Sequence, residues 1–384
     1  MKVKCRPEDF QVREHLKLRI KRAGRYSVYR LEKRLWNTLD VVRDLERKHG
    51  LRHIGRGGLK DRYSLSTQFI SVPGRGPRAI TEKNYRLEFA GMADEPVSRD
   101  VLLGNSFTVT LRELTDDELA AVTGALPNVA RFGFANYYDE QRLGSARHGA
   151  GFIARKLIDG HFNGALKLYL GTPSAADDPK TRRNKTQIEA EWGHWVACAR
   201  LVPMEARPVV EHLVRRPRDF KGAVELIPRP MLELFINAYQ SWLWNEVLTA
   251  ALKEAGVPTR TVAYSHGRFA FWNELSPEHD RNIGKLLIPT VAPDIRPAGE
   301  RILRLITAVL AKEELELKDL RPKMRVLGVY FKSFERPARV IPERMKAGAA
   351  TPDELYPGHR KLTLDFYLPT GSFATILLKR LSLF

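Results

Sequence analysis

A single aspartate in a glycine-rich segment is the most chemically suggestive feature of the sequence. Residues 57–69 read GGLKDRYSLSTQF and place Asp61 directly after Lys60, with no histidine, cysteine or second carboxylate in the segment. An aspartate in a loop most often caps a helix or forms a turn. The alternative is a carboxylate nucleophile, which must be ionised and aimed. The neighbouring cation Lys60 favours the ionised form, and a helix before the loop and a strand after it would aim the side chain.

The familiar catalytic motifs are missing from the sequence. Residues 55–61, GRGGLKD, resemble a phosphate-binding loop, but the spacing fails and Asp61 stands where that motif needs serine or threonine. The sequence contains no H-E-x-x-H, no paired C-x-x-C and no G-x-S-x-G. The ten histidines show no ligand spacing, and the two cysteines, Cys5 and Cys198, lie far apart. We therefore expect no metal site.

The charge of the chain indicates a nucleic acid as the partner. Lys and Arg total 64 against 45 Asp and Glu, which gives the 384-residue chain a formal net charge of +19. Proteins this basic, without a targeting segment, most often bind nucleic acid. No apolar run reaches the roughly 18 to 20 residues of a membrane span. The first residues include no apolar core of a signal peptide, so we expect a cytoplasmic protein that does not contact membranes.

The pattern of apolar residues predicts an α+β protein. Alternation predicts strands at 85–89, 106–112 and 362–368, whereas helical spacing and caps predict helices at 36–50, 115–126 and about 230–256. We expect Thr38 to cap the first helix and Pro127 to end the second. The strand close to the carboxyl end should complete a sheet that begins early in the chain, so the middle of the chain should be an insertion.

Aromatic residues near basic residues form a second group of candidates. Phe10 and Tyr138 lie in segments that contain basic residues, Phe373 follows the turn residues PTGS, and Asn136 precedes Tyr138 by two positions. Aromatic rings on loops can stack on a base taken out of a helix. Each ring alone is more often part of a hydrophobic core.

Six blocks, taken in order, resemble the TruD family of pseudouridine synthases. The blocks are KCRPEDFQVRE (4–14), GGLKDRYSLSTQF (57–69), GNSFTVTLR (104–112), NYYDEQRLG (136–144), AYQSWLWN (238–245) and FYLPTGSFAT (366–375). The second block resembles the signature that carries the family's catalytic aspartate. This sequence departs from the family pattern at Ser64, Tyr138, Asp139 and Leu143, where the family usually has alanine, phenylalanine, glycine and phenylalanine.

The resemblance implies a fold, a division into domains and a set of site residues. The fold would be α+β, with a mixed, largely antiparallel sheet flanked by helices in a catalytic domain formed by residues 1–150 and 325–384. Residues 151–324 would form an inserted α/β TRUD domain. Asp61 would be catalytic. Phe10, Asn136, Tyr138, Phe373, Lys4 and Lys60 would bind the substrate, with the two lysines supplying positive charge to the phosphates and to the carboxylate.

The resemblance also implies a reaction. A specific uridine, uridine 13 of tRNA, would be flipped out of its helix and isomerised to pseudouridine. Asp61 would attack the nucleotide or remove the C2′ proton, and the sequence does not decide between these routes. An isomerisation needs no cofactor, and we expect a monomer that binds RNA. The alternative, from another functional class, is a non-catalytic RNA-binding protein or tRNA-folding chaperone with the same fold.

Overall fold

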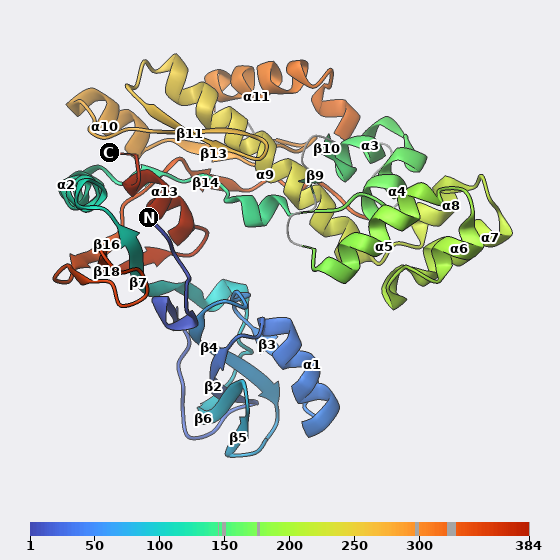
Figure 1. Ribbon diagram of the computed structural model, residues 1–384, viewed down its shortest axis with the longest axis horizontal. Helices are drawn as coiled ribbons and strands as arrows, with labels where there is room; N and C mark the ends of the chain where they lie inside the picture. The colour runs from blue at the N-terminus through green and yellow to red at the C-terminus, as the bar shows by residue number, and fades with distance from the viewer. Residues whose placement is uncertain (145, 148–150, 175–176, 296–298, 321–327, 384) are drawn as a thin grey trace. The chain divides into compact units, whose positions relative to one another are not determined.

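The computed structural model describes every residue except 145, 148–150, 175–176, 296–298, 321–327 and 384. The chain forms two compact units (Figure 1). Unit 1 comprises Met1–Phe134 and Val340–Phe384, and unit 2 comprises Ala135–Arg339. Residues 135–147 and 328–339, which we assigned to the catalytic domain, group with unit 2. The boundaries expected at 150 and 324 lie outside the described residues.

Unit 1 is built on a sheet of ten strands. In spatial order its main path is β16-β18-β7-β1-β4-β2-β6-β5, with β17 paired to β18 and β3 paired to β4. The only parallel pair along this path is β1 with β4, so the predicted mixed, largely antiparallel sheet is confirmed. The strands are β1 (Phe10–Leu16), β2 (Tyr26–Arg34), β3 (Gly55–Arg56), β4 (Leu65–Pro73), β5 (Ala79–Glu82), β6 (Tyr85–Ala93), β7 (Leu102–Leu114), β16 (Glu343–Ala347), β17 (Thr351–Pro352) and β18 (Arg360–Pro369).

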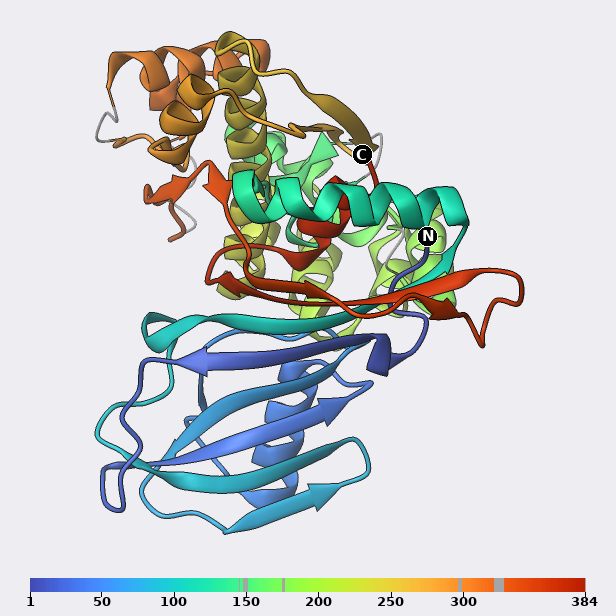
Figure 2. The same cartoon turned by 90° about the vertical axis from the view of Figure 1, so that its left-hand side faces the viewer.

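The two ends of the chain meet in this sheet. β18 pairs antiparallel with β7, and Phe366 lies opposite Phe107. Their rings stack with centroids 5.3 Å apart, and both side chains are buried. Figure 2 shows β18 alongside β7, with the blue amino-terminal strands continuing the sheet. The prediction that the carboxy-terminal strand completes a sheet begun earlier is therefore confirmed.

The helices of unit 1 correct two sequence-based expectations. The helix α1 (Thr38–His49) has Asn37 rather than Thr38 as its N-cap, because the Asn37 side chain accepts the Asp40 amide. The helix α2 (Asp116–Phe132) continues through Pro127 instead of ending there. Its last turns bury Val129 and Phe132, and this packing outweighs the missing amide of the proline. The remaining elements are α13 (Ala374–Leu381), η1 (Pro7–Asp9) and η2 (Arg99–Val101).

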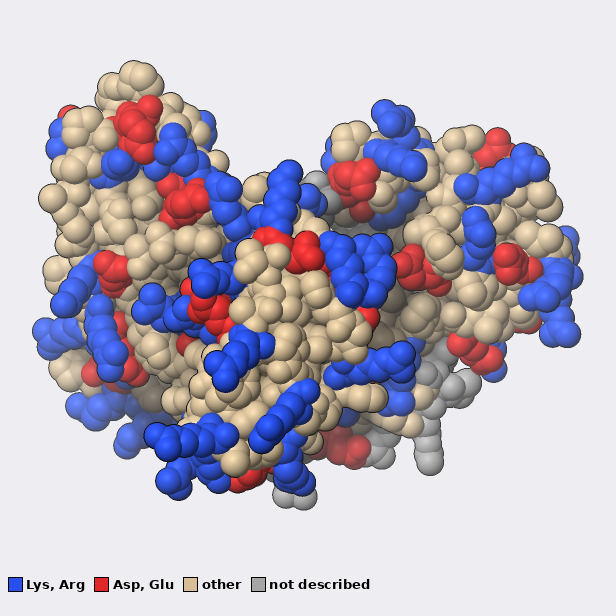
Figure 3. Space-filling view, turned by 90° about the horizontal axis from the view of Figure 1, so that it is seen from below, with Lys and Arg blue, Asp and Glu red and all other residues tan. Residues whose placement is uncertain are grey.

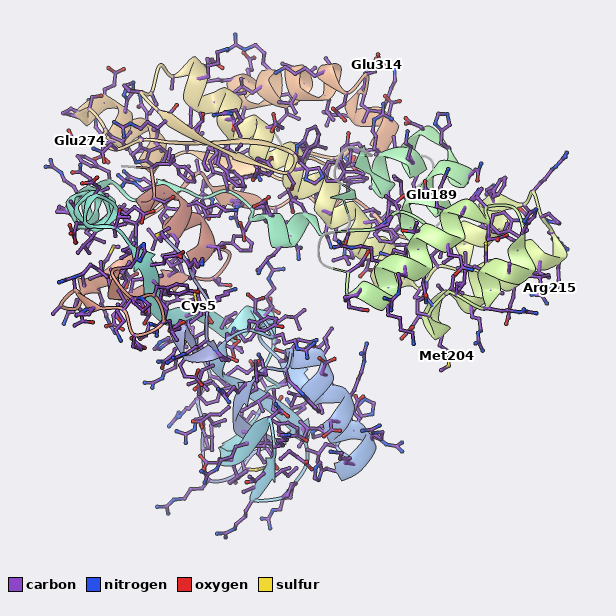
Figure 4. The ribbon with its side chains drawn as sticks, in the orientation of Figure 1. Cys5, Glu189, Met204, Arg215, Glu274 and Glu314 are labelled. Carbon is purple, nitrogen blue, oxygen red and sulfur yellow. The ribbon has the colours of Figure 1, made fainter. Side chains whose placement is uncertain are left out.

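Unit 2 is mainly helical. Its longest helix, α9 (Arg229–Glu254), confirms the helix expected at 230–256 and is buried on most of its surface. Met204 and Arg215, labelled in Figure 4, belong to the helical part that precedes α9. The remaining elements are η3 (Glu140–Leu143), β9 (Ala146–Arg147), β10 (Gly151–Phe152), α3 (Ile153–Asp159), α4 (Phe162–Leu170), α5 (Pro179–Ala190), α6 (Trp195–Ala199), η4 (Met204–Ala206), α7 (Arg207–Arg215), α8 (Phe220–Glu225), β11 (Arg260–Tyr264), β12 (Gly267–Phe271), α10 (Pro277–Gly284), β13 (Leu287–Pro289), α11 (Glu300–Lys312), η5 (Leu317–Leu320) and β14 (Glu335–Pro337).

Two short strands, β8 (Phe134–Ala135) and β15 (Arg339–Val340), lie where the chain passes from one unit to the other. None of the described helices is both long enough and apolar enough to cross a membrane.

Candidate active site

Asp61 lies on the loop between β3 and β4 of unit 1. Its Oδ2 atom accepts a hydrogen bond of 2.6 Å from the Lys4 ammonium. The Asp61 side chain is 42% exposed and that of Lys4 is 18% exposed, so the carboxylate is paired and still open to solvent. An opposite charge at this distance favours the ionised carboxylate. This position is compatible with a carboxylate that meets an external substrate.

Lys4 reaches Asp61 from a constrained amino-terminal segment. Its backbone φ is 61°, in the left-handed region that a non-glycine residue rarely adopts. Its ammonium also lies 4.4 Å from the centroid of the Phe10 ring, a cation–π contact. Lys2 fixes the segment by exchanging two main-chain hydrogen bonds with Arg112 of β7. The strained backbone at Lys4 coincides with the ion pair, as is common at functional sites.

Lys60 has a different partner from the one we expected. Its ammonium donates a hydrogen bond of 2.7 Å to Glu14 Oε1, and this ion pair is buried, with side-chain exposures of 7% and 0%. Glu14 is fully enclosed and needs a counter-charge, because an unpaired buried carboxylate is costly. Lys60 supplies that charge. Lys4, and not Lys60, therefore forms the ion pair with the Asp61 carboxylate. A contact of Lys60 with an RNA phosphate stays a prediction.

The loop around Asp61 is anchored to the elements on both sides. The Lys60 amide donates to Thr38 Oγ1 at the start of α1, and Thr38 in turn donates to Gln68 of β4. The second oxygen of Glu14 accepts the Phe69 amide of β4. These bonds connect the loop to β1, α1 and β4. The helix before the loop and the strand after it therefore fix its path, as the sequence predicted.

A buried lysine, which the motif analysis missed, holds the main chain at Asp61. Lys33 is 1% exposed, and its ammonium donates hydrogen bonds of 2.7 Å to the carbonyls of Trp36 and Asp61. Burial lowers the pKa of Lys33 to about 8, although the negative charge of Asp61 opposes this shift. Residues 29, 31 and 33 of β2 share its inward face, so the strand's alternation could have revealed a lysine at a core position.

The two candidate phenylalanines lie in different settings. Phe10, at the start of β1, is 5% exposed and meets the Phe107 ring edge-on at 6.0 Å. Its contact with Lys4 places it beside Asp61. Phe373 is half-buried at the amino end of α13, where its carbonyl accepts the amides of Ile376 and Leu377.

Asn136 and Tyr138 form a separate cluster inside unit 2. The Arg336 guanidinium donates to the carbonyl and to the Oδ1 atom of Asn136, at 2.7 Å and 2.8 Å. It also lies 4.0 Å from the centroid of the Tyr138 ring, and the ring meets Trp244 edge-on at 5.5 Å. The Asn245 side chain exchanges two hydrogen bonds with the main chain of Tyr138. Arg336 lies 200 positions from Asn136, so no local pattern could have identified it.

Other motif residues have structural partners. Arg112, from the third block, forms buried ion pairs with Asp9 of the first block and with Asp353, at 2.9 Å and 2.8 Å. A third pair with Glu354, at 3.0 Å, is more exposed. These contacts join the amino-terminal segment, β7 and the chain before β18. Within the described residues, no group of three histidine, cysteine or acidic side chains could hold a metal ion.

Comparison with known proteins identifies the family. The family model for tRNA pseudouridine synthase D (TruD) matches residues 1–381. A relative from Methanococcus maripaludis, named "Probable tRNA pseudouridine synthase D 1", is 32% identical over 99% of both chains. The tRNA pseudouridine synthase D of Aquifex aeolicus is 31% identical over 99% of this chain and 98% of its own length.

A solved structure supports the same conclusion at the level of the fold. A crystal structure from Methanosarcina mazei that carries the TruD name is 23% identical and covers 99% of this chain and 93% of its own. The TM-score of 0.71 shows a shared fold. Because the family match extends over nearly the whole chain, this protein belongs to the TruD family of tRNA pseudouridine synthases.

Proposed function

We propose that this protein converts uridine 13 of tRNA to pseudouridine, with Asp61 as the catalytic carboxylate. One observation carries the catalytic assignment. The Asp61 carboxylate is paired with Lys4 and remains 42% exposed, on a loop that α1 and β4 hold in place. The Glu14 carboxylate, by contrast, is enclosed with Lys60 and does not face solvent.

The reaction moves the bond between the ribose and the uracil from N1 to C5 and exchanges one proton. The N1–C1′ bond of uridine breaks, the uracil turns, and a C5–C1′ bond forms while the proton on C5 is lost and N1 gains one. Asp61 acts either by attacking the nucleotide or by removing the C2′ proton. Before either step the uridine must leave its stack, at a cost of a few kcal/mol. The overall change is an isomerisation, so the product has the same atomic composition as the substrate.

Substrate recognition would combine charge with aromatic contacts. Lys and Arg side chains predominate over Asp and Glu on the face drawn in Figure 3, which suits a polyanionic ligand. The proposed substrate contacts are Lys4, Phe10, Lys60, Asn136, Tyr138 and Phe373. Arg336 covers part of the Tyr138 ring, so a uracil stacked there would use another part of the ring or displace the guanidinium.

Replacing Asp61 with asparagine tests the assignment. Asp61→Asn keeps the size of the side chain and removes its charge, so we expect pseudouridine formation to fall at least ~10³-fold. Carbodiimide labelling of tRNA after incubation measures the product. Asp94→Asn is the matched control, because Asp94 is also exposed and paired with a lysine, Lys21. A normal rate in Asp61→Asn would disprove the catalytic role.

The same assay separates the enzyme from the alternative function. A tRNA-folding chaperone of this fold would bind tRNA without producing new carbodiimide label in any sample. Mapping the labelled position in tRNA tests the choice of uridine 13, since product at another uridine would leave the chemistry intact and refute only the target.

A further inference from the structure

Lys33 connects the active-site loop to the start of helix α1 from inside the fold. Its ammonium donates to the carbonyl of Trp36, just before α1, and to the carbonyl of Asp61 on the loop. Both bonds are 2.7 Å long, within the range for charged donors. Ser64 donates to the same Asp61 carbonyl at 2.8 Å. The main-chain carbonyl of Asp61 therefore accepts hydrogen bonds from both the Lys33 ammonium and the Ser64 hydroxyl.

The position of Lys33 is an unfavourable one for a lysine. Its side chain shares the inward face of β2 with Tyr29 and Leu31, both 0% exposed. Burying an ammonium costs free energy, and replacing buried charges with apolar groups of similar volume often leaves stability unchanged or increases it. Packing alone would be met by an apolar side chain, whereas the carbonyls of Trp36 and Asp61 need a donor. The ammonium therefore has a purpose other than packing.

Several charged groups act on Lys33 from the elements that surround it. Asp61 on the loop and Asp40 on α1 favour its charged form, whereas Lys60 on the loop opposes it. Burial outweighs these effects and lowers the pKa of Lys33 to about 8, so the side chain loses its proton at moderately alkaline pH. A neutral amine can still donate a hydrogen bond, but its bonds lose the strength that the positive charge gives.

We infer that Lys33 is a positioning residue for the reaction, because its ammonium fixes the main chain of Asp61 and thereby the direction of the catalytic carboxylate. The inference rests on the proposed role of Asp61. Lys4 holds the carboxylate from the exposed side, and Lys33 holds the carbonyl of the same residue from the core. The two lysines together hold the side-chain carboxylate and the main-chain carbonyl of Asp61.

The substitution Lys33→Met removes the ammonium and keeps a side chain of similar length. We expect kcat to fall ~10²-fold, since a displacement of about 1 Å at a reacting group has that effect. The dissociation constant for tRNA should change by less than about threefold, because Lys33 is buried and does not face RNA. The melting temperature should fall modestly, because the Trp36 carbonyl loses this donor while the Asp61 carbonyl still accepts from Ser64.

A matched control separates positioning from folding. Val72 lies in the core that packs against α1, and Val72→Ala should lower the melting temperature without changing kcat by more than about twofold. A purely structural role for Lys33 predicts that Lys33→Met behaves like this control. Normal kcat in a folded Lys33→Met protein would overturn the inference.

The pH dependence is a second readout, and it remains available if Lys33→Met does not fold. In single-turnover reactions at constant ionic strength, the wild-type rate should fall between about pH 7 and 9, centred near pH 8, as Lys33 loses its proton. The residual rate of Lys33→Met should lack this decline. A wild-type rate that is flat from pH 7 to about 9.5 would also overturn the inference.

The variant at Asp61 distinguishes failure of this inference from failure of the proposed function. An active Asp61→Asn protein would refute the catalytic role of Asp61. The positioning role of Lys33 would then be refuted as well, because it rests on that catalytic role. An inactive Asp61→Asn protein together with a fully active Lys33→Met protein would refute only the role of Lys33.

Discussion

Three lysines surround the loop that carries Asp61, and each contacts a different group. Lys4 pairs with the Asp61 carboxylate, Lys33 donates a hydrogen bond to the Asp61 carbonyl, and Lys60 neutralises Glu14. Their exposure follows these tasks, since Lys4 is the most accessible and Lys33 the most enclosed. A single exposed carboxylate is thus supported by three cations without being buried by any of them.

Removing the cation that contacts the carboxylate should weaken catalysis without unfolding the protein. We expect Lys4→Met to lower the single-turnover rate roughly 10- to 100-fold, because the ionised carboxylate loses its partner and its orientation. Lys2→Met is the matched control, since Lys2 lies in the same segment and pairs with Glu113 at the surface. Equal rates for the two variants would show that the Lys4–Asp61 pair has no catalytic importance.

At the scale of elements, local patterns predicted three of the longer helices and three strands, but not their long-range partners. Helical spacing and capping residues correctly predicted that α2 begins near Thr115. Its end was predicted too early, at Pro127, because a local proline signal does not include the packing of Val129 and Phe132. That β18 joins a sheet begun early in the chain could be inferred, because an apolar strand needs a sheet, but its place beside β7 could not. The partners of Lys60 and Asn136 could not, since Glu14 and Arg336 are distant in sequence.

The ion-pair group around Arg112 should contribute strongly to the stability of unit 1. In Arg112→Met the carboxylates of Asp9 and Asp353 lose the cation that neutralises them in a buried setting. We expect the free energy of unfolding to fall by about 3–5 kcal/mol, measured by urea denaturation at pH 7. Arg86→Met is the control, because the Arg86–Glu88 pair is exposed and should contribute less than about 1 kcal/mol. Equal losses would refute the special role of Arg112.

At the scale of the whole molecule, the positive charge is far larger than the active site requires. The net charge of +19 is spread over both units, and Lys and Arg side chains predominate on the face in Figure 3. Such a surface neutralises phosphates, which raises affinity and association rate without reading the base sequence. Under the proposed function, selection of one uridine would then depend on local contacts and on the ease of flipping that nucleotide.

Binding to tRNA should therefore depend steeply on salt and little on the Asp61 carboxylate. Each phosphate contact releases counterions, so ~6 contacts would give log K against log salt a slope of roughly −4 to −5. Fluorescence anisotropy with labelled tRNA between about 50 and 300 mM KCl measures this slope. Asp61→Asn should keep the slope because the substitution leaves the phosphate-binding cations in place. A flat dependence would show that the basic surface does not bind the RNA backbone, and affinity would then have to come from base and aromatic contacts.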